Sequence, residues 1–132
     1  MLSTRPEIMI CGLTRPRQAE SCVQAGADAI GLVFYKRSPR NVDSATAAEI
    51  CTTVRGQACA VGVFVDASYD RIMARVNRCG LDAVQLHGNE NQNLVERLRL
   101  KNLIVLKALF ASRPPRLDAA AVYAPDAFLV EC

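Results

Sequence analysis

The chain has 132 residues, the length of one ordinary domain, and 51% of them are apolar, which is enough for a single buried core. A net charge of +3 and 5% aromatic residues, with no tryptophan, argue against nucleic acid as a partner. No apolar run approaches the roughly 20 residues that span a bilayer, and residues 1–7 do not resemble a signal peptide. We therefore expect a cytoplasmic protein without membrane or nucleic-acid partners.

The cysteines stand far apart in the sequence and form no C-x-x-C pair. They are Cys11, Cys22, Cys51, Cys59, Cys79 and Cys132. Only one histidine, His87, is available to join them in a metal site. The pattern predicts neither a zinc site nor a disulfide framework. Most of these cysteines are expected to be small buried hydrophobes in a reducing compartment.

In the first third of the chain, short β-rich segments run into helical patterns. The first strand is expected at residues 7–11, EIMIC. Thr14 is a candidate N-cap for the helix that follows, with Pro16 in its first turn and Gly26 at its end. The second strand, DAIGLVF at residues 28–34, is nearly all apolar, as strands buried on both faces are.

The same alternation continues to the end of the chain. Further strands are expected at residues 58–65, 82–87, 102–109 and 127–131. Apolar residues at helical spacing predict helices between the strands, and Gly56 and Gly80 end two of them. A weak, Ala-rich helix is expected around residues 117–122, after the break at SRPPR.

A short sequence repeat marks the point where helices give way to strands. GADAI at residues 26–30 and GLDAV at residues 80–84 share it, and PDAFL at residues 125–129 is a weaker copy. Repeated βα units with short turns require parallel strands, because each crossover helix returns the chain to the same edge. No linker interrupts the series, so residues 1–132 are expected to form one domain.

Two architectures accept this series of elements: an open doubly wound sheet and a (β/α)₈ barrel. Polar residues stand at or after the carboxyl ends of the strands: Cys11, Arg40, Asp66, His87, Lys107 and Glu131. A barrel gathers those ends around one mouth, which favours the barrel. Such barrels typically have about 250 residues. We therefore expect an α/β protein with about six βα units, a partial barrel that lacks the last two.

Four motifs, in order, resemble the phosphoribosylanthranilate isomerase family of tryptophan biosynthesis. They are ICGLT at residues 10–14, GADAIGLVFYKRSPRNV at 26–42, VGVFVD at 61–66 and VQLHGNE at 84–90. The resemblance implies a (β/α)₈ barrel and an Amadori rearrangement, from N-(5-phosphoribosyl)anthranilate to 1-(2-carboxyphenylamino)-1-deoxyribulose 5-phosphate, without metal or organic cofactor.

The same resemblance implies roles for particular residues. Cys11 matches the general base, and Gly12 after it suits a tight turn and close substrate approach. Arg40 matches a substrate-binding arginine facing the anthranilate carboxylate; a solvated loop charge is the alternative. His87 matches a residue that lines the active site and binds the substrate as a hydrogen-bond donor, with a structural histidine as the alternative. Asp66 is a second-tier substrate-binding candidate, or simply a helix cap.

The sequence also departs from the family pattern. Met9 stands where the family usually has lysine, and Glu131 stands where the family has its general acid, an aspartate. Glutamate performs the same acid chemistry with a side chain longer by one methylene, and a shift near 1 Å in a catalytic group costs on the order of 10²-fold. We therefore take Glu131 as the candidate general acid.

No Gly-rich phosphate loop follows Glu131 in these residues. The sequence interpretation is therefore a fragment of a longer chain, or a truncated product that needs a partner. One alternative is another phosphosugar-barrel isomerase or epimerase, for which Lys107 is a Schiff-base candidate. A second alternative is a non-catalytic α/β domain that binds a partner.

Overall fold

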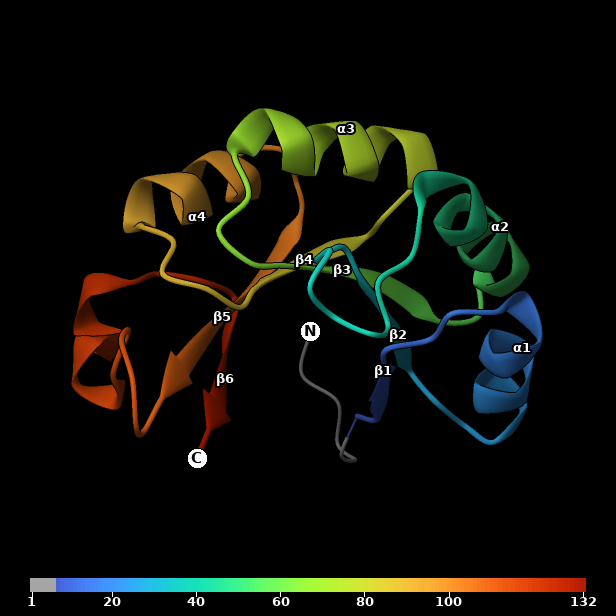
Figure 1. The fold of residues 1–132 in the computed structure, drawn as a ribbon, viewed down its shortest axis with the longest axis horizontal. Helices are drawn as coiled ribbons and strands as arrows, with labels where there is room; N and C mark the ends of the chain where they lie inside the picture. The colour runs from blue at the N-terminus through green and yellow to red at the C-terminus, as the bar shows by residue number, and fades with distance from the viewer. Residues whose placement is uncertain (1–6) are drawn as a thin grey trace.

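A computed structural model describes residues 7–132, and six parallel strands form its single sheet (Figure 1). The strands are β1 (Met9–Cys11), β2 (Ala29–Val33), β3 (Cys59–Phe64), β4 (Ala83–Leu86), β5 (Ile104–Phe110) and β6 (Ala127–Glu131). The helices are α1 (Pro16–Gln24), α2 (Ser44–Val54), α3 (Tyr69–Cys79), α4 (Gln92–Arg99) and the 3₁₀ helix η1 (Leu117–Val122). The order of strands in the sheet is the order in the chain, and all five pairings are parallel.

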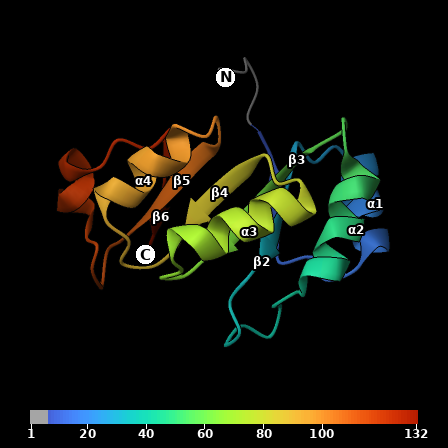
Figure 2. The same ribbon diagram turned by 90° about the horizontal axis from the view of Figure 1, so that it is seen from above.

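The sheet curls, and helices α1 to α4 cover its convex side (Figures 1 and 2). A doubly wound sheet has helices on both faces, so the expectation of a barrel-type fold is confirmed and the open alternative is wrong. The structure is a half-barrel with edge strands β1 and β6 among the described residues. No helix in residues 7–132 is long and apolar enough to cross a membrane.

Alternation along the strands divides the sheet into two faces. On the convex face, Ile30 and Leu32 of β2 and Val84 and Leu86 of β4 pack in one hydrophobic core with apolar residues of the helices. The residues between them in each strand turn to the concave face. The strand register then places Cys11, Gly31, Val33, Gln85, Phe110 and Glu131 on that concave side.

The repeated aspartates of the GADA, GLDA and PDA motifs share one structural role. Each precedes an even-numbered strand and accepts a hydrogen bond from a backbone N–H at the start of the neighbouring odd-numbered strand. The bonds run from Ile8 N to Asp28 Oδ2 (2.9 Å), from Ala60 N to Asp82 Oδ2 (2.9 Å) and from Val105 N to Asp126 Oδ2 (2.8 Å). The repeat therefore joins strands in pairs at the amino-terminal side of the sheet.

The helix ends follow the sequence expectations with two differences. Gly26, Gly56 and Gly80 all have positive φ, as helix-ending glycines do. The N-cap of α1 is Arg15, one residue later than the predicted Thr14, because the Gln18 side chain accepts hydrogen bonds from both backbone N–H groups. The Ala-rich helix at 117–122 is a 3₁₀ helix rather than an α-helix.

Candidate active site

Cys11 is the last residue of β1, and its thiol lies against the backbone of β2. A side chain at Gly31, its register partner, would place a Cβ 2.7 Å from Cys11 Sγ. Glycine at this position therefore leaves the space that the thiol occupies. The concave face thus holds a sulfur atom at the carboxyl end of the first strand.

Burial and two neighbours, Arg40 and Gly12, act on the pKa of this thiol. Although Cys11 as a residue is exposed, partial burial of its thiol raises the pKa above the ordinary value of 9.0, and the nearby Arg40 charge and a hydrogen bond from the Gly12 backbone lower it. Burial has the largest effect, so the pKa stays raised. The thiol is therefore mostly protonated at neutral pH, and Arg40 favours its thiolate.

Arg40 crosses directly over Gly12. A Cβ at Gly12 would lie 2.6 Å from Arg40 Cδ, and the φ of +86° also disfavours any other residue there. Within residues 7–132 no carboxylate lies within ion-pair distance of the Arg40 guanidinium. The structure therefore brings Cys11, Gly12 and Arg40 together and leaves a positive charge beside the thiol.

His87 and Glu131 form the second part of the site. His87 Nε2 lies 3.1 Å from Glu131 Oε2, and His87 Nδ1 lies 3.0 Å from Gln85 Oε1. The imidazole also packs edge-on against Phe110, with ring centroids 5.4 Å apart. The contact with Gln85 Oε1 is a hydrogen bond when Nδ1 carries the proton, because an amide oxygen only accepts, and Nε2 then faces the carboxyl group of Glu131.

Gln85 is a site residue that the sequence interpretation missed. Only 4% of Gln85 is exposed. It lies in β4, two residues before His87, which directly follows the strand. Alternation along a strand puts residues at i and i+2 on one face, and this signal was present in the QLH motif. Gln85 orients the imidazole toward Glu131.

Asp66 contacts a neighbouring loop instead of capping a helix. Its Oδ1 accepts a hydrogen bond from Asn89 N (2.7 Å), while its own backbone N–H donates to Glu90 (3.0 Å). The N-cap of α3 is Ser68, whose hydroxyl accepts from Arg71 N. Asp66 therefore ties the loop after β3 to the loop after β4.

Lys107 lies on the other face of the sheet. Its Nζ is fully buried and donates to Glu90 Oε1 (3.1 Å) and to the carbonyl oxygens of Leu86, Gly88 and Ala108. Its register partner Leu86 belongs to the core beneath the helices. The expectation that Lys107 joins the barrel mouth is therefore wrong, and an ammonium so enclosed is not placed for Schiff-base formation.

Parallel strands wrapped by helices on one side, with a thiol, a guanidinium and an imidazole–carboxyl pair at the strand ends, define a member of the (β/α)₈-barrel class. A profile of the family described as N-(5'phosphoribosyl)anthranilate (PRA) isomerase matches residues 8–126. The chain belongs to this family.

Curated relatives carry the same family name along nearly the whole chain. N-(5'-phosphoribosyl)anthranilate isomerase of Desulfatibacillum aliphaticivorans is 48% identical over 126 residues, which cover 96% of this chain and 58% of that protein. The isomerase of Geotalea uraniireducens is 38% identical over 125 residues, covering 95% and 60%. The chain therefore spans less than two thirds of the length of these relatives.

Solved structures show the same relation. A phosphoribosyl anthranilate isomerase in complex with reduced 1-(o-carboxyphenylamino)-1-deoxyribulose 5-phosphate superposes with a TM-score of 0.89 at 31% identity, over 96% of this chain and 65% of that one. The isomerase of Thermotoga maritima gives 0.84 at 30% identity, over 97% and 63%.

Proposed function

We propose that the protein containing this chain is a phosphoribosylanthranilate isomerase of tryptophan biosynthesis that acts in the cytoplasm. One observation carries the proposal: the concave face holds both a candidate base and a candidate acid. The thiol of Cys11 lies near the charge of Arg40, and the carboxyl group of Glu131 is hydrogen-bonded to His87. Membership of the isomerase family supports it. The substrate is a small phosphosugar, N-(5'-phosphoribosyl)anthranilate.

The reaction consists of proton transfers. An acid protonates the furanose ring oxygen, the C1–O bond breaks, and the nitrogen lone pair forms the Schiff base. A base then removes the proton from the sugar C2, which gives an enolamine, and this tautomerises to the amino-ketose. A thiolate and a carboxylic acid supply both steps.

Cys11 is the general base in this proposal. The thiolate is the competent form, and the guanidinium of Arg40 beside it favours that form. Arg40 also has the planar fork that binds a carboxylate bidentately, and its guanidinium has no carboxylate partner among residues 7–132. We assign Arg40 to the anthranilate carboxylate, with Gly12 giving the room that this approach needs.

Glu131 is the general acid, and His87 positions it. Gln85 bonds one ring nitrogen of His87, and the other lies within hydrogen-bonding distance of Glu131 Oε2. The same hydrogen bond restrains the longer glutamate side chain, which is half exposed. This arrangement offsets the extra methylene relative to the family's aspartate, and it uses both nitrogens of His87 within the protein.

The test is turnover of phosphoribosylanthranilate by the protein that contains this chain, followed as the loss of the substrate's fluorescence. Glu131→Gln removes the acid and should lower kcat by about 10²- to 10⁴-fold, the usual contribution of a positioned acid. Glu96→Gln, an exposed glutamate on α4, makes the same change away from the concave face and should leave kcat unchanged. Full turnover in Glu131→Gln would contradict the assignment, and no turnover in the unchanged protein would favour the non-catalytic alternative.

His87 is tested by separating kcat from KM. Because His87 acts through Glu131 in this proposal, His87→Asn should lower kcat with little change in KM, and His87→Gln, which reaches further toward the carboxyl group, should recover part of the loss. A rise in KM at constant kcat would instead mean that His87 binds the substrate directly.

A further inference from the structure

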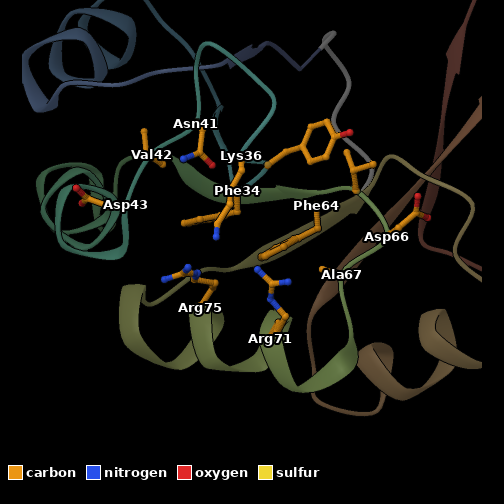
Figure 3. Close-up of a pocket in the computed structure, with 12 residues that line it drawn as sticks. Phe34, Lys36, Asn41, Val42, Asp43, Phe64, Asp66, Ala67, Arg71 and Arg75 are labelled. Carbon is orange, nitrogen blue, oxygen red and sulfur yellow. The ribbon is translucent and has the colours of Figure 1, made fainter.

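A pocket of about 400 Å³ lies outside the concave face, between the loop after β2 and helix α3 (Figure 3). Strand-end residues Phe34 and Phe64, loop residues Lys36 and Asn41, and α3 residues Arg71 and Arg75 are among those that line it. A volume in this range suits a small organic ligand. These six residues lie outside the candidate active site, and the pocket also borders Asp66, the second-tier substrate-binding candidate.

Positive side chains surround this pocket. Arg71 and Arg75 are four residues apart, one turn of α3, and Figure 3 shows both guanidinium groups turned toward Phe34 and Phe64. Lys36 approaches from the loop on the other side. Within the part of the chain that the structure describes, no carboxylate lies within 4.0 Å of any of these three cationic groups.

The two carboxylates that line the pocket are already bound to backbone. Asp43 Oδ1 accepts a hydrogen bond from Thr46 N at 2.7 Å, as the N-cap of α2. Asp66 Oδ1 accepts one from Asn89 N at 2.7 Å. Both carboxylates therefore already accept hydrogen bonds from the backbone. The pocket is lined by three positive and two negative side chains, so its net charge is positive.

The floor of the pocket is aromatic and holds one arginine in place. The rings of Phe34 and Phe64 stack with centroids 5.2 Å apart, and Arg75 Cζ lies 5.6 Å from the Phe34 centroid. Phe64 is only 2% exposed, so this side of the pocket is formed by the apolar core. An anion between the arginines and this floor is less screened than at an open surface.

We propose that this pocket binds the phosphate group of a small phosphate monoester. Two guanidinium groups and an ammonium match the double negative charge and multiple acceptor oxygens of a phosphate better than the single charge of a carboxylate. The pocket is larger than the phosphate group alone, which leaves room for the esterified part against Phe34. The site is separate from Cys11 and Glu131 and stands independently of the proposed isomerase activity.

Equilibrium dialysis of the full chain with glycerol 2-phosphate and with inorganic phosphate, at low ionic strength, tests this site. Arg71→Gln and Arg75→Gln should each weaken binding of the ester by at least about tenfold, because each removes a charge-assisted hydrogen bond. Arg78→Gln makes the same charge change on α3 outside the pocket and should leave binding within about twofold. Tighter binding of the ester than of inorganic phosphate would assign the site to a monoester; the reverse would assign it to free phosphate and overturn the monoester.

Amide NMR shifts of the unmodified protein decide the case if a variant misfolds. Adding glycerol 2-phosphate should shift resonances of residues 34–43 and 64–75 in a saturable manner. Three results would each overturn the proposal: shifts confined to other residues, absence of saturable binding, or equal weakening by Arg78→Gln. Any of them would mean that the pocket does not bind the phosphate ester specifically.

Discussion

The Cys11 thiol experiences two opposing influences, and their balance can be measured on one residue. Burial raises its pKa above 9.0, and Arg40 lowers it. Below its pKa, the rate of alkylation by iodoacetamide should therefore rise about tenfold per pH unit, with a midpoint above pH 9. Arg40→Gln removes the positive charge, so the midpoint of the alkylation rate should move to higher pH and the rate at pH 8 should fall. Peptide mass spectrometry measures the alkylation of Cys11 separately from that of the other cysteines. Arg37→Gln, an exposed arginine of the same loop, is the matched control, and an equal effect of both variants would refute a specific role of Arg40.

At this scale the sequence predicted residue types better than their orientation. Cys11, Gly12 and Arg40 stand together as their motifs indicated, because each ends a strand or lies in the loop beyond it. The motifs do not say which face a strand-end residue occupies, and for this reason Lys107 was expected at the mouth although it is buried with Glu90 under the helices. The catalytic roles themselves stay predictions until variants are assayed.

At the scale of elements, the aspartate repeat joins neighbouring strands in pairs. Asp82→Ala removes the acceptor of Ala60 N, and a lost partner for a part-buried backbone donor costs about 1–3 kcal/mol. The free energy of unfolding measured in urea should fall by that amount. Asp118→Ala changes an exposed aspartate of η1 without a hydrogen bond in the described residues and should stay within about 0.5 kcal/mol. Equal losses for both variants would mean that the repeat has no special part in stability.

The repeat was readable in the sequence, but its physical role was not. Its spacing indicates where strands begin, whereas the hydrogen bond crosses from one strand to its neighbour 20 to 22 residues away. Strand boundaries show the same limit: the first strand was expected at residues 7–11 and is Met9–Cys11, because pairing with β2 determines its extent.

At the scale of the whole molecule, curvature turns the ends of the two edge strands to the same concave side. Cys11 ends β1 and Glu131 ends β6, at opposite edges of the sheet order, and both turn to the concave side. The recurrence of polar residues at strand ends predicted this barrel-type curvature correctly. The pocket beside α3 was not predictable, since Arg71 and Arg75 have the spacing of any solvated helix face.

Turnover of phosphoribosylanthranilate by Cys11→Ala tests the central claim most directly, namely that this thiol is the base that removes the C2 proton. We expect kcat to fall by about 10²- to 10⁴-fold, while Cys22→Ala, a matched change on α1, keeps the activity of the unchanged protein and both variants show the same unfolding transition in urea. Activity of Cys11→Ala equal to that of Cys22→Ala would contradict the claim.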